Sequence, residues 1–292
     1  MPSHRMGPLY GWLLLLPAMV LMAAFTHWPT LVTIYRSFFT SGTVIRPARF
    51  AGLENYQRLL DDPVFMEVMG NTLLFAAGTV PTAIALALGM ALWANKAMAG
   101  KGFLRLAYFT PTILPMVAVA NIWLFFYTPD IGLLDQVLTS LGGSGHNWLG
   151  DPSTVLWCLV ATTVWKEAGF FMIFYLAALQ NLSPELREAA LLEGAGRLTT
   201  FRRVVFPLLM PTTIFVLINA VLNAFKLVDH LFILTKGGPN NASNLLLYYI
   251  YENAFSFFDP NYASTLTVIM LLMLALLAVL QFGFLDKRVH YR

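Results

Sequence analysis

The chain has 292 residues, of which 58% are hydrophobic and only 11% carry a charge. A soluble domain usually carries about 25% charged residues, so this composition excludes an ordinary water-exposed surface and favours a membrane protein. The net charge of +3 could suggest nucleic acid, but the basic residues do not gather with aromatic residues on one polar face, so we expect no nucleic-acid binding. Cys158 is the only cysteine and lies in an apolar run, which excludes an internal disulfide.

Six apolar runs are each close to the roughly 20 residues that a helix needs to cross a bilayer. They cover residues 10–28, 72–93, 106–127, 154–176, 204–225 and 266–284. Their hydrophobicity is continuous rather than alternating, which predicts helices instead of barrel strands. The first run could be a signal peptide, but five more runs follow it, so no soluble protein would be released. The sequence therefore predicts an all-α polytopic membrane protein with six transmembrane helices in one domain, residues 1–292.

The charges between these runs predict the orientation of the chain. If the N-terminus is cytoplasmic, 11 of the 18 Lys and Arg residues lie in cytoplasmic segments, but only 4 of the 15 Asp and Glu residues do. Cytoplasmic loops of membrane proteins carry an excess of Lys and Arg, so we expect both termini to be cytoplasmic. The first outer segment is the exception, since it holds Arg36, Arg46, Arg49 and Arg58.

The inner segment 181–206, between the fourth and fifth runs, has the pattern of a helix followed by a tight turn. Ser183 is a good N-cap, and Pro184 suits the first helical position. A short helix over 185–192 is then expected to end at Gly194, with Gly196 close behind. Such a compact knob could enter a groove on another protein.

The same segment resembles the EAA loop of binding-protein-dependent ABC importer permeases, which combines Glu-Ala-Ala with a following glycine and a proline that opens the next span. The matching residues are Glu188, Ala189, Ala190, Gly194, Ala195 and Pro207, with Gly196 in the same turn. Glu193 departs from the aspartate usual in the family but keeps the charge. The resemblance implies the MetI-like permease core and a loop that docks onto an ATP-hydrolysing subunit. The alternative is a generic basic inner loop with helix-capping residues.

Two outer segments resemble those of sugar and glycerol-3-phosphate permeases. They are Thr-Lys-Gly-Gly-Pro at 235–239 and Phe-Ala-Gly-Leu-Glu-Asn-Tyr at 50–56, although the first could also be an ordinary turn. The resemblance implies uptake of a sugar, a polyol or a glycerol-3-phosphate-like solute across the bacterial cytoplasmic membrane. It also implies a second permease subunit in a heterodimer, two ATP-binding subunits and an extracytoplasmic solute-binding protein.

The sequence contains no Gly-x-x-x-x-Gly-Lys-Ser/Thr segment that could cradle phosphates, and no metal-ligand cluster or nucleophile–base spacing. We therefore expect no enzyme activity and no cofactor on this chain, with ATP and magnesium bound by a partner. An ion-coupled secondary carrier is the alternative. Such carriers often show paired repeats with buried carboxylates, whereas here no repeat is visible and Glu167 is the only acid well inside a run.

Polar residues in the fifth run are candidates for the solute pathway. Asn219, Asn223, Lys226 and His230 are spaced by four, three and four residues, which predicts one helical face, with Asp229 beside it. Asparagine suits hydroxyl-rich solutes, and lysine could meet an anionic group. Hydrogen bonding to the sister subunit and snorkelling of the lysine would explain the same pattern.

The fourth run holds Trp165, Lys166 and Glu167 in mid-span. Adjacent helical residues project about 100° apart, so these three cannot share one face. We expect one of them to line the pathway while another pairs elsewhere. Trp165 could stack on a sugar ring or pack in the core.

Overall fold

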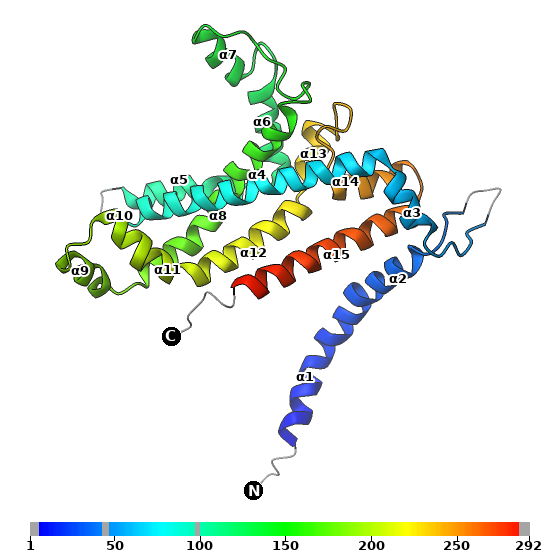
Figure 1. The fold of residues 1–292 in the computed structure, drawn as a ribbon, viewed down its shortest axis with the longest axis horizontal. Helices are drawn as coiled ribbons and strands as arrows, with labels where there is room; N and C mark the ends of the chain where they lie inside the picture. The colour runs from blue at the N-terminus through cyan, green and yellow to red at the C-terminus, as the bar shows by residue number, and fades with distance from the viewer. Residues whose placement is uncertain (1–5, 43–46, 97–99, 286–292) are drawn as a thin grey trace. The chain divides into compact units, whose positions relative to one another are not determined.

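The computed structural model describes residues 6–42, 47–96 and 100–285, and the chain divides into two compact units (Figure 1). One unit combines residues 1–62 with 250–273, and the other combines residues 63–249 with 274–292. Within the described ranges the regular elements are helices, apart from one isolated bridge between Phe39 and Phe50. The all-α prediction is confirmed, while the single transmembrane domain over 1–292 stays a prediction.

The first unit starts with a continuous helical run in which no residue from Tyr10 to Arg36 is buried. A helix that is apolar all round belongs in lipid or against another membrane helix. The elements of this unit are α1 (Met6–Met22), the π-helical η1 (Ala23–His27), α2 (Trp28–Arg36), α3 (Glu54–Asp61), η3 (Glu252–Ser256) and the first half of α15 (Pro260–Leu285).

The second unit is built around α4 (Pro63–Ala94) and α8 (Val155–Gln180), which pack along each other. Ala83, Ala87 and Ala91 are spaced by four residues and are all buried, and small residues in such a row let two helices approach closely. The other helices of this unit are α5 (Lys101–Ile113), α6 (Met116–Tyr127), α7 (Leu133–Ser140), α9 (Pro184–Leu192), α10 (Arg197–Thr200), η2 (Phe201–Val205), α11 (Phe206–Leu208), α12 (Met210–Lys226) and α13 (Asp229–Leu234), and α14 (Leu246–Tyr251) follows at its edge.

The third apolar run is a broken helix rather than a straight span. Leu114 is extended because it precedes Pro115, a position where the α conformation is disfavoured. Helices α5 and α6 consequently meet at an angle of 100°. In Figure 1, α5 runs beside α4 and α8, while α6 turns away from them.

Among the described residues, five helices are long and apolar enough to cross a membrane, or six if the bent α5–α6 pair is one span. This agrees with the six predicted runs, although several helices are longer than the runs. The second span begins at Pro63 rather than near residue 72, and the fourth continues to Gln180.

Candidate functional site

The inner segment folds as the predicted helix and turn. The Ser183 hydroxyl oxygen accepts a hydrogen bond from the backbone N–H of Glu185, and Pro184 occupies the first helical position of α9. Gly194 has a φ of +76°, which a residue with a side chain rarely adopts. The N–H of Gly194 donates to the Leu191 carbonyl at 3.0 Å, and the N–H of Ala195 donates to the Ala190 carbonyl at 2.9 Å. These two bonds are the Schellman motif that closes a helix.

The rest of the matched segment leaves one side of α9 uncovered by the described chain. Ala190 is buried, whereas Glu188 and Ala189 are exposed. Gly196 has an ordinary φ of −67° and precedes α10, so its backbone would accept another residue. Pro207 is exposed in α11, just after the π-helical η2. The exposed face of α9 is therefore available to a partner.

Two of the polar pathway candidates contact each other between α8 and α12. The side-chain amide of Asn223 donates to Oε2 of Glu167 at 2.9 Å, and Glu167 is buried. Buried carboxylates are costly unless hydrogen bonds satisfy them, so this bond stabilises Glu167 and joins the two helices. The candidates brought together are Glu167 and Asn223.

The neighbours of Glu167 on α8 point elsewhere, as the helical spacing predicted. Lys166 donates from Nζ to the Thr112 carbonyl at 3.3 Å, and the Thr112 hydroxyl donates to the Lys166 carbonyl at 2.9 Å. Trp165 is 39% exposed and packs edge-to-face against Trp123, with ring centroids 5.8 Å apart.

The prediction that residues 219–230 form one helical face is wrong at its last member. Helix α12 ends at Lys226 because Leu227 is extended, and His230 lies on the separate helix α13. His230 is fully buried and stacks on Phe75, with centroids 5.9 Å apart. Lys226 and Asp229 are exposed. The Asn219 amide donates to the Phe215 carbonyl of its own helix at 2.7 Å.

The segment between α6 and α8 holds a carboxylate cage that sequence reasoning missed. The carboxylate of Asp135 is buried and accepts hydrogen bonds from the backbone N–H groups of Asp130 and His146 and, at 2.6 Å, from the Trp148 indole. The Asp130 backbone bond is the main reason that the pKa of Asp135 lies below its usual range. Nothing in the sequence indicated this cage, since ring and backbone donors leave no signal in a residue pattern.

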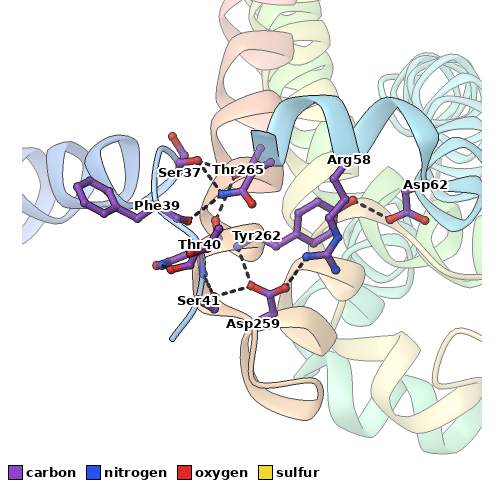
Figure 2. Close-up of polar contacts among 11 residues, drawn as sticks. Ser37, Phe39, Thr40, Ser41, Arg58, Asp62, Asp259, Tyr262 and Thr265 are labelled. Carbon is purple, nitrogen blue, oxygen red and sulfur yellow. Dashed lines mark hydrogen bonds and ion pairs between the residues drawn. The ribbon is translucent and has the colours of Figure 1, made fainter. Parts of the chain in front are cut away.

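A second polar cluster, formed by Ser41, Arg58, Asp259 and Tyr262, lies in the first unit and is called the Asp259 cluster below. Figure 2 shows the Asp259 carboxylate between the Arg58 guanidinium, at 2.7 Å, and the Ser41 hydroxyl, at 2.5 Å. The guanidinium also lies 4.0 Å from the centre of the Tyr262 ring, whose hydroxyl donates to Asp62. Burial raises the pKa of Asp259, but the bonds from Ser41 and Arg58 outweigh it and hold the pKa below its usual value.

The described residues contain no group of three His, Cys, Asp or Glu side chains that could hold a metal ion. The site consists of three kinds of feature. The helix–turn of α9 can dock a partner, the Glu167–Asn223 bond is a buried polar contact between α8 and α12, and the clusters around Asp135 and Asp259 order the segments next to helix ends.

Comparison with known proteins identifies the family. Residues 64–291 match the family described as "binding-protein-dependent transport system inner membrane component". The chain belongs to this family. It is a multi-pass membrane permease of an ABC importer, with ATP hydrolysed on a separate subunit. Membership rules out the ion-coupled secondary carrier.

Two relatives and one solved structure cover nearly the whole permease. The chain is 36% identical to the sulfoquinovosyl glycerol transport system permease protein of Agrobacterium fabrum. This alignment spans 259 residues and covers 88% of the chain and 84% of the relative. The chain is also 31% identical to the sn-glycerol-3-phosphate transport system permease protein of the same organism, over 96% of each chain. A bacterial alginate ABC transporter, solved with its periplasmic protein, has the same fold, with a TM-score of 0.81, 21% identity and coverage of 97% and 94%.

Proposed function

We propose that the chain is one of two permease subunits of an importer for a small hydroxylated solute, with α9 receiving the ATPase. The observation that carries this proposal is the capped, exposed helix–turn over residues 183–196, within a chain of this family. A rigid knob held by a Schellman turn transmits a movement better than a frayed loop would, because its end cannot unwind independently.

The partners follow from the family's division of labour. A second permease, in a heterodimer, would complete the pathway, two ATP-binding subunits would carry ATP and magnesium, and an extracytoplasmic binding protein would deliver the solute. In this arrangement 11 of the 18 Lys and Arg residues lie in the inner segments, and this bias supports a cytoplasmic position for the α9 segment and for both termini.

The Glu167–Asn223 contact and nearby Lys226 are the proposed solute-facing groups, together with Asn219 on the same helix as Asn223. A carboxylate and an amide can exchange their mutual hydrogen bond for bonds to solute hydroxyls. Lys226 is exposed at the end of α12 and could meet an anionic group. The solute class is therefore a sugar, a polyol glycoside or a glycerol-3-phosphate-like molecule.

Replacing Lys226 separates the two solute chemistries. If Lys226 binds a phosphate, Lys226→Gln should reduce uptake of a phosphorylated solute far more than that of a neutral one. Equal losses would argue for a neutral sugar or polyol. Binding of the same panel to the solute-binding protein gives the matching control, because that protein does not contain Lys226.

The coupling role is tested by Gly194→Asp. A side chain at this φ strains the turn, and the added charge sits at the proposed ATPase contact. Uptake should be abolished while the chain still inserts in the membrane. Thr199→Asp is the matched control, since it adds the same charge at an exposed position outside the matched residues. Normal uptake by the Gly194 variant would refute the assignment.

A further inference from the structure

The described structure contains a groove of about 670 Å³ beside α9, in the unit that holds the spans α4 and α8. Its apolar lining consists of Leu92, Leu191, Leu198, Phe201 and Val205. The volume falls in the range typical of small-molecule sites, about 300–1,000 Å³. The lining residues come from the end of α4 and from α9, α10 and η2. In Figure 1 the labels α9 and α10 stand together beyond one end of α8.

The polar part of the lining is cationic. It consists of Asn95, Lys96, Arg197 and Thr200 and includes no acid. Among the described residues, neither Lys96 nor Arg197 takes part in an ion pair. Arg105 adds a third positive charge close by, since its guanidinium donates to the Ala94 carbonyl at 3.1 Å, at the very end of α4.

The sequence around the groove indicates that it lies near the depth of lipid headgroups. The apolar part of α4 ends at Trp93, and Lys96 follows just beyond the helix, as a basic residue does where a span leaves the hydrocarbon core. Leu92 is in the last turn of α4, and Val205 lies a few residues before α12, which begins at Met210. Apolar side chains at the membrane surface next to unpaired cations match a molecule with an acyl chain and an anionic head.

We propose that this groove binds an anionic phospholipid of the leaflet on the α9 side, with its phosphate between Lys96 and Arg197 and its upper acyl chain along Phe201 and Leu198. A free phosphate ion would leave five apolar side chains facing water. A bound lipid would contact residues between 191 and 205, which include the end of α9 and the segment after it. The lipid composition of the membrane would then influence the coupling between the permease and the ATPase. The site does not depend on the proposed solute or on the role of Gly194.

Lipid selectivity of the purified importer tests the proposal. The complete complex is placed in phosphatidylcholine nanodiscs with trace spin-labelled phosphatidylglycerol or spin-labelled phosphatidylcholine, and the immobilised fraction of each label is measured. Each surface cation contributes about 1 kcal/mol toward an anionic lipid, so the double variant Lys96→Gln/Arg197→Gln should lower the selectivity for phosphatidylglycerol about thirtyfold. Lys101→Gln/Arg202→Gln is the matched control, since it removes one lysine and one arginine that are five residues away in the sequence and do not line the groove. Its selectivity should stay near that of the wild type.

Several outcomes would overturn the proposal. Equal losses in both double variants would mean a diffuse surface charge, and no loss in the first would mean no site. Displacement of the labelled lipid by millimolar inorganic phosphate would mean a site for free anions. Loss of the ATPase subunits with unchanged lipid selectivity would mean that the groove receives that partner. If the first variant does not assemble, Thr200→Glu keeps both cations, adds a repelling charge to the lining and should lower the selectivity in the same way.

Discussion

Asn223 and Glu167 are 56 residues apart in the sequence, and their bond brings two pathway candidates from different helices together. Helical spacing predicted that Glu167 would point away from Trp165, but it could not show which residue would satisfy the carboxylate. That choice depends on the packing of α8 against α12, which no local pattern encodes. Leaving a buried polar group unsatisfied costs about 1–3 kcal/mol, so the pair should behave as a unit.

The first prediction concerns this unit. Asn223→Ala should reduce uptake about tenfold or more, because the remaining carboxylate loses its donor in an apolar setting. In a Glu167→Gln background the same change should cost much less, and the double-mutant cycle for uptake measures the coupling. Asn121→Ala serves as the control, since that amide donates to the Val117 carbonyl of its own helix. Additive losses would show that the two side chains act separately.

Gly169 is a residue whose role is visible only in three dimensions. A Cβ at this position would overlap the Tyr108 carbonyl oxygen, so the glycine allows α5 to pack directly on α8. In the sequence, Gly169 is one small residue in an apolar run and gives no signal of a close approach.

Gly169→Ala should therefore destabilise the permease by about 1–3 kcal/mol, because α5 must move outward. Gly89→Ala is a matched control, since a Cβ there has no neighbour within 4 Å and alanine is the better helix former. Thermal unfolding of both purified variants gives the comparison. A Gly169 variant as stable as the Gly89 variant would contradict the close approach.

At the scale of elements, the sequence predicted helix ends well where capping chemistry is local. Ser183, Pro184 and Gly194 delimit α9 as expected, because a cap or a left-handed turn depends on a few adjacent residues. The sequence was less informative where helices break inside apolar runs. Pro115 explains the bend between α5 and α6, but nothing in the sequence separates α12 from α13 at Leu227. Hydrophobicity continues across such breaks.

The Asp259 cluster joins α3 to the start of α15. Its contribution to the stability of the folded chain should decrease as the pH falls. The pKa of Asp259 is lowered in the folded chain, so its contribution is present above the ordinary aspartate pKa of about 3.9 and is lost as the pH falls through the lower, folded value. The difference in unfolding temperature between wild type and Asp259→Asn should be constant from pH 7 to 5 and shrink below about pH 4.

Glu54→Gln is the control for this pH series. Glu54 pairs with Arg49 at 2.8 Å, but both side chains are more than half exposed, and such surface pairs contribute little. Its effect on the unfolding temperature should be small at every pH. A difference for Asp259→Asn that grows on acidification would contradict the assigned pKa shift.

For the whole molecule, composition and six apolar runs were enough to predict an all-α membrane protein, and the 181–206 segment was enough to indicate the family. Apolar length and charge bias are properties of the whole chain, so they can be read from the sequence without knowledge of side-chain contacts. The Asp259 cluster escaped prediction because it unites residues from separate segments, and the Asp135 cage escaped it because its donors are backbone and ring N–H groups. The groove beside α9 was likewise invisible, since its lining comes from the end of α4 and from α9, α10 and η2.

The central claim is that α9 lies on the cytoplasmic side and receives the ATPase, and one labelling measurement tests both parts. Leu192 is 91% exposed at the end of α9. In a Cys158→Ser background, Leu192→Cys should react with a membrane-impermeant maleimide only from the cytoplasmic side, and binding of the ATPase subunits should protect it. Asn240→Cys, at an exposed position in the opposite loop, should react only from outside and gain no protection. Labelling of Leu192→Cys from outside, or equal labelling with and without the ATPase, would contradict the account.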